Sequence, residues 1–213
     1  MQSDHELLEA WVDGEAGAGQ ELVSRYVPTI YRFFRNKVPR EMEDLSQRTF
    51  LALLKSRERA RSIRSFRAYL LTIARNELLM HIRRHERASG RLHATDISVH
   101  DIGDEFSSCD ALAHSAEQVL LLRALRRAPL DLQTTIELVY WEQLSLQEAG
   151  EVLGVPVGTV KSRIARAKGL LREIIEGLEA DQEVRNSTLV GLETWVSELR
   201  RHLGRGSTTR RGG

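Results

Sequence analysis

The stretch LQEAGEVLGVPVGTVKSRIARA, residues 146–167, decides the fold. Its apolar residues recur at helical spacing on both sides of Gly154–Pro156, where a glycine and a proline end one helix and begin the next. The first helix is expected over about 146–153, and the second is expected to run to about Ile175. Two helices joined by so short a turn have the layout of a helix-turn-helix, whose second helix enters the major groove of DNA.

The second of these helices has an apolar face and an opposite face that is small and basic. Val160, Ile164, Ala167 and Leu171 fall within one arc at about 100° per residue. The opposite arc carries Gly158, Lys161, Ser162, Ala165 and Arg166, with Thr159 and Lys168 at its margins. Residues 156–172 include basic residues and no acidic one, which suits contacts to phosphates and guanine edges. The alternative is an ordinary amphipathic helix whose basic face is only solvated.

The bulk composition does not by itself indicate a nucleic-acid-binding protein. The chain has 213 residues, of which 41% are hydrophobic and 29% charged, and its net charge is +1. Its periodicity is helical throughout, so an all-α fold is predicted. The single cysteine, the polar N-terminus and the lack of a long apolar run predict a cytoplasmic protein with no membrane insertion.

Composition also divides the chain into four parts. Residues 1–88 are predicted to form a first small helical domain, and residues 89–113 an acidic, flexible linker. Residues 114–175 form the second domain, which contains the helix-turn-helix. Residues 176–213 are expected to be a C-terminal extension with one helix and a disordered end. We therefore expect two helical domains joined by an acidic linker.

Residues 155–166, VPVGTVKSRIAR, resemble the helix-turn-helix of extracytoplasmic-function (group IV) sigma factors of the sigma-70 family. The resemblance implies that this helix binds the minus-35 promoter element. The implied DNA contacts are Thr159, Lys161, Ser162, Arg163, Ala165 and Arg166. The helical arc independently places Lys161, Ser162, Ala165 and Arg166 on the exposed side, with Arg163 at its edge, where it is better placed for a phosphate than for a base.

Residues 42–51, MEDLSQRTFL, resemble the helix with which this family docks on the polymerase clamp. The implied polymerase contacts are Asp44, Leu45, Gln47 and Phe50. Arg48 departs from the family pattern, which usually has an acidic residue there. Apart from the resemblance, Glu43 and Asp44 have a simpler explanation as favourable charge at a helix N-terminus.

Residues 65–76, SFRAYLLTIARN, with the later IRR at 82–84, resemble the minus-10 region of the same family. A melted single strand requires a basic track for its phosphates and a pocket for an unstacked base. The implied DNA contacts are Arg61, Arg64, Arg75, Asn76, Arg83 and Arg84. Met80 departs from the family pattern, which often has an acidic residue at this position.

The resemblance implies a sigma factor that directs RNA polymerase to promoters, with core RNA polymerase and promoter DNA as partners and an anti-sigma factor as a further expected partner. The alternative is a stand-alone helix-turn-helix regulator that binds duplex DNA without polymerase. We expect no enzymatic activity, metal or cofactor. His81 and His85 have no third ligand nearby, Cys109 near His114 has no orienting group, and a phosphate-binding loop is missing.

The C-terminal extension carries a further helical pattern. Ser187 or Thr188 is expected to cap a helix whose apolar stripe is Leu189, Leu192, Val196, Leu199 and Leu203. A helix of about 15 residues is marginal alone, so the stripe should be buried. Either it braces its own second domain, or it is a regulatory helix that covers a binding face or docks a partner.

Overall fold

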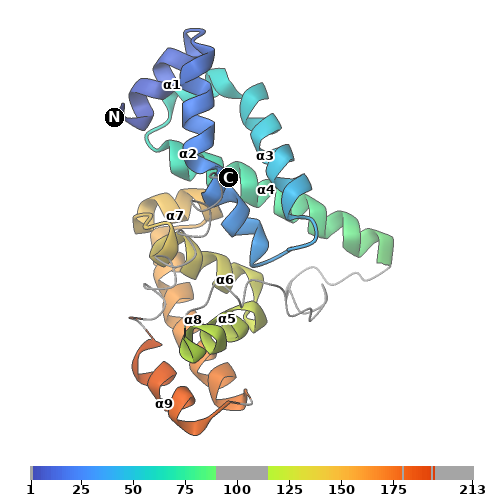
Figure 1. Ribbon diagram of the computed structural model, residues 1–213, viewed down its shortest axis with the longest axis vertical. Helices are drawn as coiled ribbons and strands as arrows, with labels where there is room; N and C mark the ends of the chain where they lie inside the picture. Colours follow the sequence, from blue (N-terminus) through green and yellow to red (C-terminus); the bar gives the residue numbers. More distant parts are fainter. Residues whose placement is uncertain (1, 90–114, 179, 193, 195–213) are drawn as a thin grey trace, which may run out of the picture.

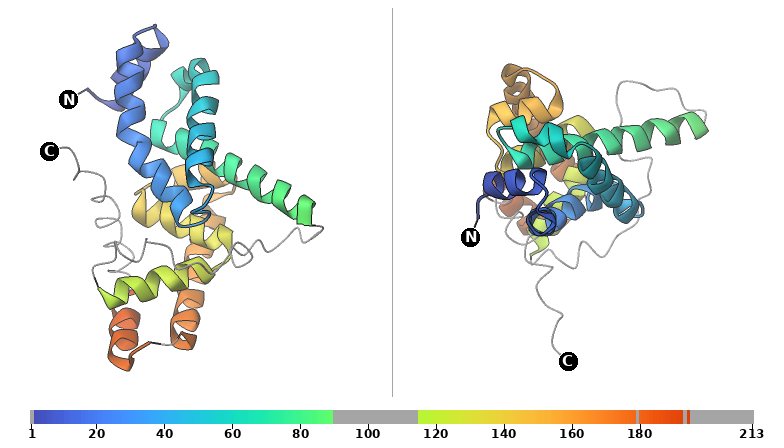
Figure 2. Two further views of the ribbon diagram at one scale, coloured as in Figure 1. Left: turned by 45° about the vertical axis from the view of Figure 1, so that its right-hand side comes forward. Right: turned by 90° about the horizontal axis from the view of Figure 1, so that it is seen from above.

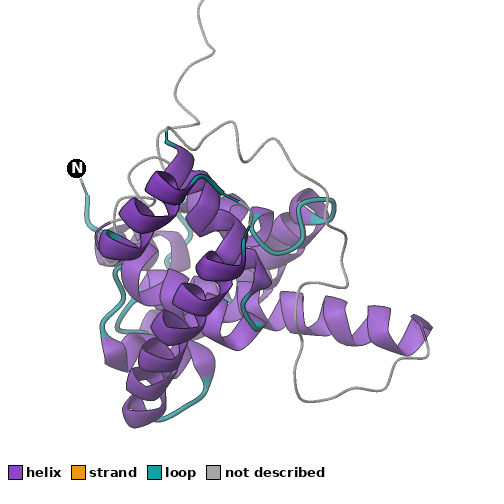
Figure 3. Cartoon of the chain, turned by 90° about the horizontal axis from the view of Figure 1, so that it is seen from below, coloured by secondary structure: helices purple, strands orange, loops and turns teal. Residues whose placement is uncertain are grey.

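The computed structural model describes residues 2–89, 115–178, 180–192 and 194 (Figure 1). Within these ranges every regular element is a helix (Figure 3), as the all-α prediction requires.

We call α1 to α4 the N-terminal half and α5 to α9 the C-terminal half. The elements of the N-terminal half are α1 (Asp4–Val12), α2 (Ala16–Arg35), α3 (Met42–Lys55), the 3-10 turn η1 (Arg57–Ser62) and α4 (Phe66–Ser89). Those of the C-terminal half are α5 (Ala116–Arg127), α6 (Leu130–Ile136), the π-helical turn η4 (Glu137–Trp141), α7 (Leu146–Leu153), α8 (Val157–Gly177) and α9 (Gln182–Val190).

The N-terminal half begins with a capping box. The backbone N–H of Ser3 donates to Glu6 at 2.6 Å, and the Glu6 N–H donates back to the Ser3 hydroxyl at 3.3 Å, which fixes the start of α1. Helix α1 then packs on α2, where Gly19 faces the indole of Trp11. A Cβ at Gly19 would lie 2.3 Å from that ring, so only glycine permits this close approach.

Helices α2, α3 and α4 enclose the core of the N-terminal half. Leu45, Thr49 and Leu53, which recur at a spacing of four, point inward from α3. The C-terminal part of α4 leaves this core and projects beyond the body of the molecule (Figure 2). The helix thereby presents a long exposed surface while its first turns stay buried.

In the C-terminal half, α5, α6 and α8 pack around Trp141, and α9 lies against α5 and α8. The predicted start of the C-terminal helix falls inside α9. Asp181 caps it by accepting the Glu183 N–H at 2.8 Å, whereas Thr188 is buried inside the helix and its hydroxyl donates to the Val184 carbonyl. The expected cap at Ser187 or Thr188 is therefore wrong. The stripe residues Val196, Leu199 and Leu203 lie outside the described residues.

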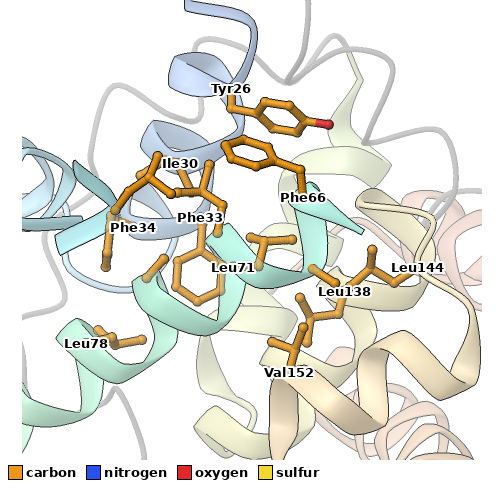
Figure 4. Packing of buried hydrophobic residues seen from close by; sticks show 14 of the residues in the cluster. Tyr26, Ile30, Phe33, Phe34, Phe66, Leu71, Leu78, Leu138, Leu144 and Val152 are labelled. Atoms are coloured by element: carbon orange, nitrogen blue, oxygen red, sulfur yellow. The ribbon is translucent and has the colours of Figure 1, made fainter. Parts of the chain in front are cut away.

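The two halves share a core instead of standing apart. One hydrophobic cluster combines Leu71 and Leu78 of α4 with Leu138, Leu144 and Val152 of the C-terminal half (Figure 4). Helix α4 lies directly on α7, the first helix of the helix-turn-helix. The sequence predicted two domains but gave no indication that they would pack on each other. In the described part of the chain, none of the helices is long and apolar enough to cross a membrane.

Candidate nucleic-acid interface

The helix-turn-helix is built as the sequence predicts. Ser145 and Glu148 form a capping box at the start of α7, and Gly154 ends the helix in the left-handed conformation, with φ of +67°. Gly150 is needed for a different reason. A Cβ there would lie 2.8 Å from the Val155 carbonyl oxygen, so the turn closes tightly against α7.

Helix α8 presents the small and basic face to solvent. Val160, Ala167 and Leu171 are buried on its inner side. The exposed residues include Lys161, Ser162, Ala165 and Arg166, and Thr159 is half-buried beside them. The Ser162 hydroxyl donates to the Thr159 carbonyl at 2.9 Å. Four of the six residues implied as minus-35 contacts thus form a surface that a DNA groove can reach.

Arg163 is placed differently from the other basic residues of this set. Its Nε lies 3.3 Å from Oδ2 of Asp131 at the start of α6, and its side chain is only 23% exposed. The ion pair holds the guanidinium at the edge of the exposed face. The expected contact of Arg163 with a phosphate stays a prediction.

The residues implied as minus-10 contacts lie along α4 and in the segment before it. Arg64, Asn76, Arg83 and Arg84 are exposed, and Arg61 lies on η1, where its side chain is outside the described residues. Arg83 and Arg84 lie on the C-terminal part of α4, which projects from the body (Figure 2), and Arg64 precedes the helix, so exposed guanidinium groups are available to phosphates at both ends of this segment.

Arg75 is the exception on α4, because it is half-buried. Burial lowers the pKa of its guanidinium, and repulsion from Arg163 and Arg83 lowers it further. An arginine of the expected minus-10 surface therefore lies within electrostatic reach of the recognition helix. The two predicted DNA-binding surfaces meet at this point of the molecule.

The residues implied as polymerase contacts divide between the surface and the core. Asp44 and Gln47 are exposed on α3, Phe50 is half-buried against the core, and Leu45 is fully buried. The Leu45 side chain therefore packs α3 onto the core, and it has no exposed surface with which to contact polymerase. Arg48, the residue that departs from the family pattern, is ion-paired with Asp44 at 2.9 Å.

Two exposed leucines on α3 were missed by the sequence reasoning. Leu51 is 54% exposed and Leu54 is 49% exposed. Both fall on the face of Asp44 and Gln47, since positions 44, 47, 51 and 54 recur at steps of three and four. This spacing was visible in the sequence and predicts an apolar patch beside the polar contacts.

Among the residues set aside earlier, His81 and His85 stack with ring centroids 6.4 Å apart. Cys109 and His114 lie outside the described residues. The described ranges contain no group of three or more His, Cys, Asp or Glu side chains that could hold a metal ion.

Comparison with known families matches residues 22–88 to Sigma-70 region 2 and residues 118–171 to Sigma-70, region 4. The first match covers α3 and α4, and the second covers the helix-turn-helix. The chain belongs to the extracytoplasmic-function sigma factors of the sigma-70 family. The sequence-based assignment to this family is confirmed, and so is the assignment as an RNA polymerase sigma factor for promoter-specific initiation.

Curated relatives of this sigma factor come from distant bacteria. The ECF RNA polymerase sigma-E factor of Haemophilus influenzae is 29% identical over 187 residues, which cover 83% of this chain and 97% of the relative. The sigma factor BldN of Streptomyces coelicolor is 32% identical over 174 residues, covering 80% and 65%, respectively. SigW of Bacillus subtilis is 28% identical over 174 residues, covering 78% and 92%.

Two solved structures have a similar fold. The sigma factor RpoE of Bartonella quintana, in complex with the anti-sigma factor NepR, matches with a TM-score of 0.60 at 21% identity and covers 74% of this chain and 96% of that one. CnrH in complex with the cytosolic domain of CnrY matches with a TM-score of 0.59 at 21% identity, covering 84% and 100%.

Proposed function

We propose that this sigma factor reads the minus-35 element with α8, holds the opened minus-10 strand along α4, and docks on core RNA polymerase through α3. The exposed basic face of α8 is the observation that carries this proposal. Lys161 and Arg166 flank Ser162 and Ala165, whose small side chains let the helix approach the floor of the groove. Cationic side chains at such a position neutralise phosphates and can bond guanine edges.

The polar and apolar residues of α3 support the docking assignment. The Asp44 carboxylate can accept hydrogen bonds, and the Gln47 amide can both donate and accept them. Leu51 and Leu54 add exposed apolar surface on the same face of α3. A mixed patch of this kind is common at protein interfaces, where an apolar centre is surrounded by polar groups. A stand-alone DNA-binding regulator has no need of such a surface so far from its recognition helix.

Transcription in vitro separates the proposal from the stand-alone regulator. Core polymerase with this protein should initiate at a specific promoter, whereas core polymerase alone should not. A protein that shifts promoter DNA alone and never supports initiation would contradict the proposal. Because its work takes place on the bacterial chromosome, we place the protein in the cytoplasm.

We further propose that an anti-sigma factor restrains this chain. The support is the fold shared with RpoE and CnrH, which were solved with an anti-sigma factor and with the cytosolic domain of CnrY, respectively. For the C-terminal extension we propose the brace, because α9 packs on α5 and α8 with Thr188 buried, and Leu192, which follows the helix, is buried as well. Pull-down of partners from the source cells tests the first proposal.

A further inference from the structure

Asp131 lies in the first turn of α6, where the main chain holds its carboxylate. The Leu132 N–H donates to Oδ1 at 2.8 Å, and the Asp131 carbonyl accepts the Thr135 hydroxyl at 2.6 Å. Pro129 precedes the helix and makes no side-chain cap, so the Asp131 carboxylate is the negative charge of the first turn, where the helix dipole favours it. The backbone thus fixes Oδ1 and leaves Oδ2 for another partner.

The partner of Oδ2 is Arg163 of the recognition helix α8. Its Nε lies 3.3 Å from Oδ2, and α6 and α8 pack closely against each other (Figure 1), so the pair joins two elements with a fixed relation. The Arg163 side chain is 23% exposed, and that of Asp131 is 47% exposed. Within the described ranges the guanidinium has no other ion pair or hydrogen bond, so its two Nη groups remain available as donors.

The other basic residues on the exposed face of α8 are not held in this way. Lys161 and Arg166 are exposed, and neither has an acidic partner in the described part of the chain. A long side chain that is mobile before binding loses rotamer freedom when it binds, and this loss lowers the affinity. Arg163 has already lost much of this freedom in the free protein, because Asp131 and the packing of α6 on α8 hold it.

A held arginine suits a phosphate contact better than a base contact. Phosphate contacts fix the register and orientation of a protein on the duplex without reading its sequence. Arg163 precedes Arg166 by three residues, which is almost one helical turn. A phosphate bound at Arg163 would therefore set how α8 lies in the groove, and with it the base that Arg166 can reach.

We propose that Asp131 is a positioning residue of the minus-35 site, which holds the Arg163 guanidinium ready for a phosphate and thereby fixes the register of α8 in the groove. The inference rests on the function proposed above. From charge alone, removal of an acidic residue beside DNA relieves repulsion and strengthens binding. Removal of Asp131 should instead weaken binding, because Arg163 loses its anchor.

Binding of the holoenzyme to DNA tests this role. The probe is a fluorescent duplex whose minus-35 element the natural holoenzyme has selected from random sequence. Asp131→Asn keeps an oxygen for the Leu132 N–H and removes the charge, so the affinity should fall about three- to tenfold. Asp131→Glu restores the carboxylate and should recover part of this loss. Glu151→Gln is the matched control, since Glu151 is exposed on α7 and contacts Gln147, and its affinity should be unchanged or slightly higher.

A double-mutant cycle separates positioning from folding. In an Arg163→Ala background, Asp131→Asn should change the affinity by at most about twofold, because no guanidinium is left to hold. Hydrogen exchange of the Arg163 Nε–H, followed by NMR in the free protein, reports the anchor directly. This exchange should be several-fold faster in Asp131→Asn, while the helical circular dichroism stays unchanged.

Tighter or unchanged binding by Asp131→Asn would overturn the inference. An equal loss in the natural and the Arg163→Ala backgrounds would also overturn it, since Asp131 would then act only on the fold of its domain. A holoenzyme that selects no common minus-35 sequence would instead contradict the proposed function. The cycle would then be measured on duplex of random sequence, because a phosphate contact does not depend on sequence.

Discussion

Arg163 of α8 is ion-paired with Asp131 of α6, Nε to Oδ2 at 3.3 Å, whereas Arg166, one turn later on the same helix, extends freely into solvent. The two arginines therefore have different access to DNA. We expect Arg166 to reach a base edge in the groove and Arg163 to lie at the rim of the groove, beside a phosphate.

Arg166→Ala should reduce promoter use by about 1–3 kcal/mol through the loss of a base contact, and sensitivity to the minus-35 sequence should fall with it. Arg163→Ala should weaken binding by a similar factor on all sequences and lower the salt dependence. Transcription from promoters with substituted minus-35 elements measures both effects. Equal sequence sensitivity in the two variants would argue that Arg166 contacts phosphate only.

Arg48→Glu should strengthen association with core polymerase a few-fold. Arg48 now neutralises Asp44 through an exposed ion pair one helical turn away, worth only about 0.3–0.5 kcal/mol to the helix. The variant frees the Asp44 carboxylate and restores the acidic residue usual in the family. Arg48→Ala is the matched control and should give a smaller gain. Weaker binding by both variants would show that Arg48 itself contacts polymerase.

Leu51→Ser with Leu54→Ser should reduce polymerase pull-down as strongly as Asp44→Arg with Gln47→Ala. All four side chains are exposed on α3, so neither pair should change the helical circular dichroism or the thermal midpoint. The leucines contribute apolar area, and the polar pair contributes hydrogen bonds and charge. Undiminished pull-down by both pairs would remove α3 from the docking surface.

The sequence predicts those parts of the molecule that depend on local signals. Ser145 and Glu148 have the spacing of a capping box at the start of α7, and Gly154 marks its end. Helical periodicity places Lys161 and Arg166 on the exposed face of α8. The contact between the halves has no such signal. Lys37 and Glu137, whose side chains form a buried ion pair there, are 100 positions apart in the sequence, and lysine and glutamate are residue types that usually lie on the protein surface. The half-burial of Arg75 has no local signal in the sequence either.

Gly150→Ala should destabilise the helix-turn-helix by about 1–3 kcal/mol, since the new Cβ would lie 2.8 Å from the Val155 carbonyl and the turn would have to shift. Gly158→Ala is the matched control on α8. No atom lies within 4 Å of its Cβ position, so the change should be neutral or slightly stabilising through helix propensity. Thermal unfolding followed by circular dichroism distinguishes them. A neutral Gly150→Ala would show that the turn adapts freely.

Leu192→Ala should lower the free energy of unfolding by about 2 kcal/mol or more, because Leu192 is buried in the core of the C-terminal half. Val190→Ala is the control from the same segment, since Val190 is 90% exposed and should give no measurable change. Truncation before Asp181 removes α9 altogether, uncovers part of α5 and α8, and should lower both the thermal midpoint and transcription. A truncated protein that folds normally and transcribes more strongly would favour an inhibitory helix over the brace.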